Sequence, residues 1–249
     1  MNIPPENPFS ITYLDATLET PEENLACDEA LLEMCENGYD SDVLRFWEPT
    51  QHFVVLGNSG KLQSEVYESY CRENHIPILR RISGGGTVLQ GPGCLNYSLI
   101  LRIRNSGSLS TITGTNAFVM QRNKRAIQSL IGNDIRVEGH TDLAIGGMKF
   151  SGNAQKRRQH CLLFHGTFLL HFGIVLTHEV LKLPSRQPAY RNHRSHEQFM
   201  MNLGIEGHAV KDALRKSWKA ERQMRDAPFD RIRDLVEERY SKKDWNYRH

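Results

Sequence analysis

Two short segments of the chain each combine a cationic side chain with closely spaced glycines. Arg80 to Val88 reads RRISGGGTV, and Lys149 to Gln155 reads KFSGNAQ. Because glycine has no Cβ, consecutive backbone N–H groups can converge on an oxygen-rich ligand, and lysine or arginine adds charge-assisted hydrogen bonds. Together the two segments favour a site for an anionic small molecule. Each segment alone has a purely structural alternative, a tight turn or a solvated lysine.

Several common catalytic motifs do not fit these segments. The lysine and the serine or threonine of a P-loop do not follow Gly84–Gly86, and the run does not match the G-x-G-x-x-G fingerprint of dinucleotide-binding folds. His193 and His196 lie three residues apart without a completing set of metal ligands. The sequence therefore argues against a classical NTPase, a Rossmann reductase and a metal site at these histidines.

The cysteines give no indication of disulfides or of a zinc site. They are odd in number and lack C-x-x-C or zinc-ribbon spacing: Cys27, Cys35, Cys71, Cys94 and Cys161. The first three fall in helical patterns and are expected to pack in the core or at its flank. Cys94 and Cys161 lie near the suspected site and are candidate nucleophiles.

Composition and charge exclude several classes of partner. The chain has 31 basic and 29 acidic residues, so a formal charge of +2 gives no global attraction to nucleic acid or membrane. No apolar run approaches the roughly 20 residues that span a bilayer. The polar residues 1–8 lack the regions of a signal peptide. We expect a soluble, cytoplasmic protein, and a length of 249 residues suits one domain.

Hydrophobic periodicity predicts the elements that position the two segments. Thr20, Pro21 and Glu23 mark a helix start with a capping box, and this helix ends near Gly38. Two further helices are expected at residues 64–74 and 116–131. Strands are expected at residues 43–47, 53–57, 76–81, 87–90, 97–103, 143–145, 148–151 and 162–170, and around Val137. Since several strands are neighbours in sequence, the predicted fold is α/β of the α+β type, with a mixed, largely antiparallel sheet and flanking helices.

Beyond Gly173 the sequence becomes polar and helical. Ser195 and Gln198 form a second capping box, and residues 210–222 and 229–240 carry apolar side chains on one face. We expect residues 186–249 to be a helical extension packed on the single domain 1–249, without a separate accessory domain.

Longer strings extend these patterns to a known family. The chain contains RRISGGGTVLQGPGCLNYSL, DLAIGGMKFSGNAQ and HGTFLL, which resemble the catalytic domain of lipoate-protein ligases. This family belongs to the superfamily of biotin and lipoate protein ligases and octanoyltransferases. NLACDEALL, VLRFW and VVLGNSGK precede them in the expected order, so the resemblance covers roughly residues 10–185. It implies the class II synthetase-like fold of biotin and lipoate ligases.

The resemblance implies ATP-dependent activation of lipoate or octanoate to acyl-AMP. The acyl group would then pass to a lysine of a lipoyl-acceptor protein, either a lipoyl domain or a glycine-cleavage H-like protein. ATP, Mg²⁺ and lipoate would act as substrates or activator, with no tightly bound cofactor. Larger ligases carry an accessory C-terminal domain, so a separate accessory subunit is a further implied partner. No nucleic-acid or membrane partner is expected.

The resemblance also assigns site residues. Lys149 is expected to be catalytic, because a lysine between carboxylate and phosphate oxygens stabilises the charge on both. The lipoyl and carboxylate end of the substrate would contact Arg81, Ser83, Gly84, Gly85, Gly86, Val88, His165 and Gly166. The nucleotide would contact Asn96, Asp142, Lys149, Gly152 and Ala154, with Asp142 also a candidate Mg²⁺ ligand. Leu89 and Phe150 are further candidates for an apolar lipoate tunnel.

The chain departs from the family pattern immediately after the glycines. Many ligases carry His-Asp there and Asn after the next glycine, whereas this chain has Gln90, Gly91 and Cys94 and retains Asn96. The arginine-rich glycine loop typical of biotin ligases is absent from the sequence, so lipoate or octanoate is the favoured acyl group.

An octanoyl or lipoyl transferase is the main alternative. Such an enzyme takes its acyl group from an acyl-carrier protein through a cysteine thioester and uses no ATP. One type has its cysteine three residues before the H-G histidine, whereas Cys161 lies four before His165, which on a strand turns the side chain to the opposite face. A second type has its cysteine where this chain has His140 and Thr141. A noncatalytic lipoyl-binding relative is the other alternative.

Overall fold

The computed structural model describes residues 11–104, 106–184 and 186–248. Its centre is an eight-stranded sheet in the spatial order β11-β1-β2-β6-β10-β9-β8-β7. The strands are β1 (Ile11–Asp15), β2 (Asp42–Trp47), β6 (Cys94–Arg102), β7 (Ile135–Glu138), β8 (Asp142–Ile145), β9 (Met148–Arg157), β10 (Cys161–Leu169) and β11 (Arg222–Gln223). Only β1 pairs in parallel, with β2 and β11, and the other neighbours named here are antiparallel. The prediction of a mixed, largely antiparallel sheet with flanking helices is confirmed.

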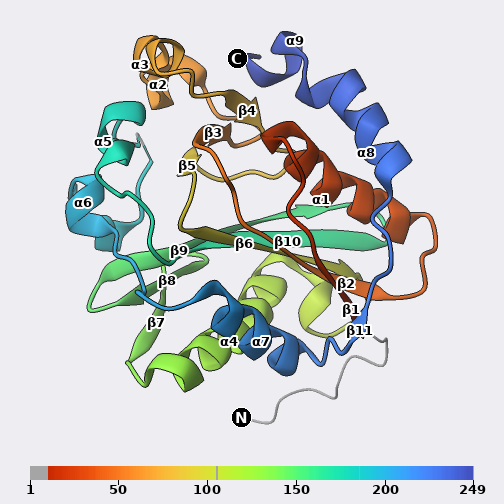
Figure 1. Ribbon diagram of the computed structural model, residues 1–249. Helices are drawn as coiled ribbons and strands as arrows, with labels where there is room; N and C mark the ends of the chain where they lie inside the picture. The colour runs from red at the N-terminus through yellow and green to blue at the C-terminus, as the bar shows by residue number, and fades with distance from the viewer. Residues whose placement is uncertain (1–10, 105, 185, 249) are drawn as a thin grey trace.

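Helices cover both faces of this sheet (Figure 1). On one face lie α4 (Ile112–Ile131) and α7 (Gly207–Trp218), and on the other lie α1 (Pro21–Glu36) and α8 (Phe229–Leu235), which continues as a π-helical turn at Val236–Tyr240. Each helix pair closes a separate apolar core against the sheet.

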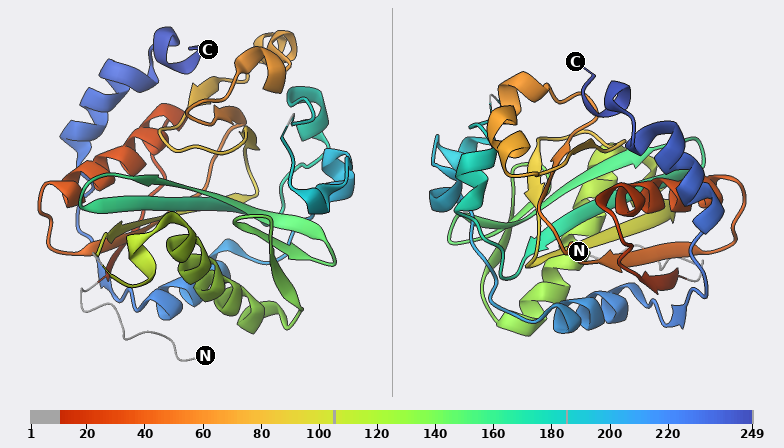
Figure 2. Two further views of the ribbon diagram at one scale, coloured as in Figure 1. Left: turned by 180° about the vertical axis from the view of Figure 1, so that it is seen from behind. Right: turned by 45° about the horizontal axis from the view of Figure 1, so that its top comes forward.

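A second, three-stranded sheet stands on the same side as α1 (Figure 2). Its strands are β3 (Phe53–Leu56), β4 (Ile78–Arg80) and β5 (Val88–Gln90), with β3 in the centre. β4 is parallel and β5 antiparallel to β3, so the glycines that connect β4 to β5 are held at one end of this sheet. The predicted strands are present, but they form a separate sheet.

The start of α1 agrees with the sequence prediction. The Thr20 hydroxyl accepts the Glu23 N–H at 3.2 Å, and the Glu23 carboxylate accepts the Thr20 N–H at 2.9 Å. Pro21 occupies the first helical position, and the helix ends at Asn37, before Gly38. The capping box therefore fixes the register of a helix whose inner face is completely buried.

The single helix predicted at residues 64–74 is wrong. The chain forms two short helices, α2 (Leu62–Glu65) and α3 (Glu68–Glu73), and Val66 between them is extended. Val66 pairs with Leu181, at the end of α5 (Leu176–Val180), and is 2% exposed in the apolar core below the small sheet. Tertiary burial of a β-branched residue outweighs local helix preference here.

Other predicted bounds are shifted by a few residues. α4 begins at Ile112 because Thr111 caps it, and β9 extends to Arg157. The second capping box at Ser195 is present, but its helix, α6 (His196–Phe199), has one turn. The helix predicted at 210–222 is α7, which ends at Trp218, and the last predicted residue, Arg222, begins β11. Single turns complete the described elements: η1 (Ser108–Ser110), η2 (Ala189–Arg191) and α9 (Lys243–Asn246).

The C-terminal part of the described chain packs on the rest. α7 lies against α4, α8 against α1, and α9 beside β4 (Figure 1). No helix in the described part of the chain is long and apolar enough to cross a membrane. The N-terminal residues 1–8 used in the sequence analysis lie outside the described residues.

Candidate active site

The glycine turn, residues 81–87, is organised by the arginine at its start. Arg81 is 8% exposed, and its guanidinium donates to the carbonyl oxygens of Gly84 at 2.7 Å and Gly86 at 2.9 Å. Burial lowers the pKa of Arg81 to about 10. The predicted substrate-binding charge of Arg81 is thus directed at carbonyls of its own turn. Gly85, at φ +92°, adopts a conformation that favours glycine.

A series of hydrogen-bonded polar side chains connects the glycine turn to α1 and to the large sheet. Ser83 Oγ lies 2.6 Å from His165 Nε2, and His165 Nδ1 lies 3.1 Å from Asp28 Oδ2. Asp28 also forms an ion pair with Arg45 at 2.7 Å. Burial alone would raise the pKa of Asp28, but the hydrogen bond to His165 and the charge of Arg45 hold it below its usual value. An ionised Asp28 therefore holds His165 with its proton on Nδ1.

Lys149 and Asp142 form the second half of the site. Their side chains pair at 2.8 Å, Nζ to Oδ1, and remain 25% and 15% exposed. The lysine lies over Gly152, where a Cβ atom would come within 2.7 Å of Nζ. Tyr190, in η2, donates its hydroxyl to Asp142 Oδ2 at 2.7 Å. An ion pair accessible to solvent therefore stands on β8 and β9, held by a tyrosine from the C-terminal part of the chain.

The fold brings the two halves together. In the β9–β10 register, Ala154 is opposite His165 and Gly152 is opposite Thr167. A Cβ atom on Gly85 would lie 3.7 Å from the Cβ of Ala154. The glycine turn of the small sheet thus faces the lysine strand of the large sheet, and small residues line the contact.

Gln90, where the sequence departs from the pattern of many ligases, forms hydrogen bonds with Thr167 and Asn96. Gln90 donates to Thr167 Oγ1 at 2.7 Å, Thr167 donates to Asn96 Oδ1 at 2.5 Å, and Asn96 donates to Gln90 Oε1 at 3.0 Å. The three side chains form a closed ring at the junction of the two sheets. A side chain at position 91 would clash with the His52 ring, because a Cβ atom there would overlap Cδ2 of His52. Asn96, predicted to contact the nucleotide, is 5% exposed and belongs to this ring.

Gly166 makes room for a neighbouring side chain. A Cβ atom at this position would overlap Asn153 Oδ1, which accepts the Tyr97 hydroxyl. Thr141 donates to the Asn153 carbonyl at 2.9 Å. Gly166 therefore allows Asn153 to lie between the paired strands next to His165. The sequence predicted a contact of Gly166 with the acyl substrate and did not predict this packing.

The residues suggested for an apolar tunnel lie in different surroundings. Val88 is 36% exposed at the surface, Leu89 is buried below the small sheet, and Phe150 is completely buried. Phe150 stacks on Phe168 with ring centroids 6.5 Å apart, in the core against α4. These three side chains do not line one common tunnel.

Both candidate nucleophilic cysteines are buried. Cys94 and Cys161 are each 1% exposed. Burial raises the pKa of Cys94 to about 12 and that of Cys161 to about 11, so both remain thiols at neutral pH. A thioester mechanism has no exposed thiolate at either position.

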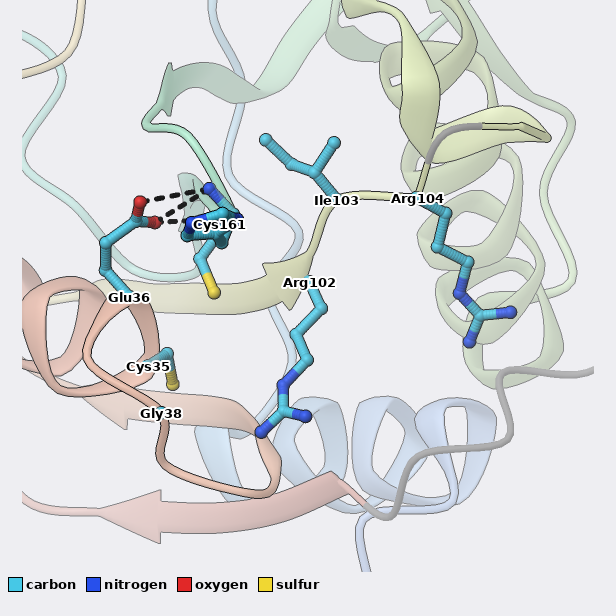
Figure 3. Close-up of a pocket in the computed structure, with 8 residues that line it drawn as sticks. Cys35, Glu36, Gly38, Arg102, Ile103, Arg104 and Cys161 are labelled. Carbon is cyan, nitrogen blue, oxygen red and sulfur yellow. Dashed lines mark hydrogen bonds between the residues drawn. The ribbon is translucent and has the colours of Figure 1, made fainter.

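Cys161 borders a separate surface hollow of about 610 Å³ at the far end of β10 from Thr167 (Figure 3). Its wall is formed by Cys35, Glu36, Gly38, Arg102, Ile103, Arg104, His160 and Cys161. Glu36 closes one side by accepting the backbone N–H groups of His160 at 3.0 Å and Cys161 at 2.8 Å. Cys161, expected near the suspected site, lies at this hollow instead, and none of the residues predicted to bind the acyl group or the nucleotide lines it.

The described residues do not form a resident metal centre. In residues 11–104, 106–184 and 186–248, no group of three or more His, Cys, Asp or Glu side chains is arranged to hold a metal ion. Asp142, the candidate Mg²⁺ ligand, has both carboxylate oxygens bonded, to Lys149 and Tyr190.

Similar sequences include lipoate-protein ligases and octanoyltransferases. The chain is 27% identical over 255 residues to lipoate-protein ligase A subunit 1 of Thermoplasma acidophilum, covering 92% of this chain and 94% of the relative. It is 26% identical over 205 residues to lipoate–protein ligase 1 of Staphylococcus aureus, of whose length it spans 61%. It is also 28% identical over 194 residues to the octanoyltransferase LipM of Carboxydothermus hydrogenoformans, covering 72% of both chains.

Solved structures share the fold. A lipoate-protein ligase A bound with ATP superposes with a TM-score of 0.81 at 23% identity, over 96% of this chain and 98% of that one. A bipartite lipoate protein ligase of Thermoplasma acidophilum, described with its E2 lipoyl domain, superposes with a TM-score of 0.79 at 24% identity, over 96% of both chains. The model of the lipoyl protein ligase A/B catalytic domain matches residues 20–219. The chain therefore belongs to the lipoyl protein ligase A/B catalytic domain family.

Proposed function

We propose that the protein is a lipoate-protein ligase, which activates lipoate or octanoate with ATP and transfers the acyl group to a protein lysine. The observation that carries this proposal is the partly exposed Lys149–Asp142 pair, because Lys149 lies on the strand whose Ala154 approaches Gly85 of the glycine turn. Burial of Cys94 and Cys161 supports a route without an acyl-thioester. The intact lysine and glycine turn also argue against a noncatalytic relative.

The first step would join two anions. The carboxylate oxygen of the fatty acid attacks the α-phosphorus of ATP, and pyrophosphate leaves, giving acyl-AMP. Lys149 would lie between the carboxylate and phosphate oxygens and stabilise the negative charge of the transition state. Backbone N–H groups of the glycine turn and of the segment around Gly152 and Ala154 would approach the ligand closely, since no bulky side chain stands there.

In the second step the ε-amine of the acceptor lysine attacks the acyl carbon, and AMP leaves. The acceptor would be a lipoyl domain or a glycine-cleavage H-like protein, as the lipoyl domain described with the Thermoplasma ligase suggests. The same relative is bipartite, so we propose that a separate accessory subunit assists the reaction. Mg²⁺ would enter with ATP.

The test is formation of lipoyl-AMP from lipoate and ATP by the purified protein, measured by mass spectrometry with and without an accessory subunit. Lys149→Ala is expected to abolish product. Lys156→Ala, a change on the same strand, is the matched control and should retain full activity. An active Lys149→Ala enzyme would contradict the assigned role.

Octanoyl transfer is a second candidate function, because the chain is also similar to octanoyltransferases of the LipM type. In that reaction octanoyl-carrier protein should leave a hydroxylamine-sensitive acyl group on a cysteine. Such an adduct on the wild-type protein, lost in Cys94→Ala or Cys161→Ala, would favour the transferase. An unmodified protein that still acylates a lipoyl domain with ATP would favour the ligase.

A further inference from the structure

Asp142 is held by two side chains at once. Its Oδ1 pairs with Lys149 Nζ at 2.8 Å, and its Oδ2 accepts the Tyr190 hydroxyl at 2.7 Å. A carboxylate that is bonded at one oxygen only can rotate about its Cβ–Cγ bond. The hydrogen bond from Tyr190 to Oδ2 prevents this rotation and so fixes the direction in which Oδ1 meets Lys149. The direction of the Lys149 ammonium thus depends on a residue 41 positions later in the chain.

Tyr190 is itself fixed to the hairpin that carries Asp142 and Lys149. Its ring lies 5.0 Å from that of Phe199, and the Arg194 guanidinium stands 5.3 Å from the Phe199 ring. Arg194 donates to the carbonyl of Gly147, in the β8–β9 turn, at 2.9 Å and to the carbonyl of Tyr190 at 2.8 Å. Tyr190 therefore has a defined position relative to the turn that joins the strands of Asp142 and Lys149.

The same segment also contacts the backbone of the lysine. Met201 N–H donates to the Lys149 carbonyl at 2.9 Å, and Met200 pairs with Lys149 as an isolated parallel bridge. Burial and the neighbouring Asp142 carboxylate raise the pKa of Tyr190 far above neutral pH, so its hydroxyl stays a donor. Backbone and side chain of Lys149 are thus both held by residues 190–201.

We propose that Tyr190 is a positioning residue for Lys149: its hydroxyl fixes Asp142, and Asp142 directs the ammonium group over Gly152. The expected effect on kcat rests on the proposed adenylation reaction. The effect on the position of the Lys149 ammonium group can be measured without that reaction. Because charge stabilisation in a transition state depends strongly on placement, loss of this hydroxyl should act on turnover more than on ATP binding.

The kinetic test is Tyr190→Phe, which keeps the ring on Phe199 and removes only the hydroxyl. A hydrogen bond to a charged group corresponds to about tenfold in rate, so we expect kcat for lipoyl-AMP formation to fall about tenfold with the KM for ATP within about twofold. Tyr13→Phe removes a hydroxyl that contacts Gln223 at the other edge of the sheet and should leave kcat unchanged. An unchanged kcat in Tyr190→Phe would overturn the proposal.

A double-mutant cycle with Asp142→Asn tests whether Tyr190 acts through Asp142. If it does, adding Tyr190→Phe to Asp142→Asn should change kcat by less than about twofold, because an amide has one acceptor oxygen and can no longer accept from both Tyr190 and Lys149. Equal losses from Tyr190→Phe in both backgrounds would mean that the tyrosine acts independently of Asp142, which would overturn the proposal.

A second readout does not need enzymatic activity. Limited acetic anhydride acetylates free amines, and peptide mass spectrometry gives the modification of Lys149 relative to Lys211, which is paired with Asp15 and Glu48. In Tyr190→Phe this ratio should rise about threefold, since the ion pair of Lys149 is less well held. A raised ratio in a protein without ligase activity would support the positioning role and reject the proposed function. An unchanged ratio would reject the positioning role.

Discussion

The Lys149 side chain has little space at its ammonium end. It lies between Asp142 on one side and the Cα of Gly152 below, where an added Cβ would stand 2.7 Å from Nζ and 2.8 Å from Cε. Both distances are too short for a contact between non-bonded heavy atoms. The flexible lysine would have to move, and it would leave Asp142.

Gly152→Ala should therefore affect activity much more than stability. We expect lipoyl-AMP formation to fall by about tenfold or more, since a shift of about 1 Å in a catalytic group can cost 100-fold. Thermal melting should change little, because the displaced group can turn toward solvent. Gly173→Ala is the control, since a Cβ there meets nothing within 4 Å. Normal turnover in Gly152→Ala would show that Lys149 tolerates a new position.

The five cysteines should be unreactive in the folded protein. All are buried, and burial raises the pKa of each thiol, to about 11 for Cys27, Cys71 and Cys161 and to about 12 for Cys94. Ellman's reagent at pH 8 should titrate fewer than about one thiol per native chain, and all five in urea. Any residual native reaction should accelerate by about tenfold per pH unit from pH 7 to 9, because the reacting thiolate fraction rises that steeply below pKa values of this size. One fast thiol in the native protein would support a thioester mechanism.

Residue types predicted which two segments come together better than they predicted the partner of each group. The fold brings the segments of Arg81 and Lys149 together, with Gly85 opposite Ala154. The acceptors of Arg81 could not be predicted, because they are backbone carbonyls positioned by the tertiary fold. Asp28 was missed for a similar reason: it reads as one more polar residue of an amphipathic helix, although it is 3% exposed and holds His165.

At the scale of secondary structure, α1 supplies both Asp28 and part of the core, and its first turn depends on Thr20. Thr20→Ala should lower the free energy of unfolding by about 1 kcal/mol, since it removes the N-cap acceptor. For a chain of this size that corresponds to a fall in melting temperature of roughly 2–4 °C. Thr20→Ser retains the hydroxyl and should melt like the wild type. Equal melting of Thr20→Ala and Thr20→Ser would show that the cap adds little.

Elements with strong local signals were predicted well, whereas β1, β11 and the extended Val66 were not predicted. Local caps set the start of α1 and the one-turn helix at Ser195. β11 has two residues that pair with Thr12 and Tyr13, and Val66 is extended because it pairs with Leu181. Such partners lie far apart in sequence, so no local periodicity indicates them.

At the scale of the whole molecule, the small sheet must be held against the large one for the glycine turn to face Lys149. Arg80, which is completely buried beside this turn, bonds two distant segments. It donates to the carbonyls of Gly57 at 2.9 Å and Gly60 at 2.8 Å, and also to those of Trp245 at 3.1 Å and Asn246 at 3.1 Å. In return, Trp245 donates its indole N–H to the Arg80 carbonyl at 2.8 Å. The end of the chain is thereby joined to the base of the glycine turn.

Deleting residues 243–249 should destabilise the protein through Arg80. The guanidinium would lose several acceptors while remaining charged, and each hydrogen bond to a charged group contributes about 1.5–3 kcal/mol. We expect a loss of about 3 kcal/mol in the free energy of unfolding, or roughly 6–12 °C in melting temperature. Arg80→Met in the full chain should also destabilise, and combining it with the deletion should cost less than the sum, since both remove the same contacts. Additive losses would instead mean that α9 stabilises the molecule by packing alone, independently of the arginine beside the glycine turn.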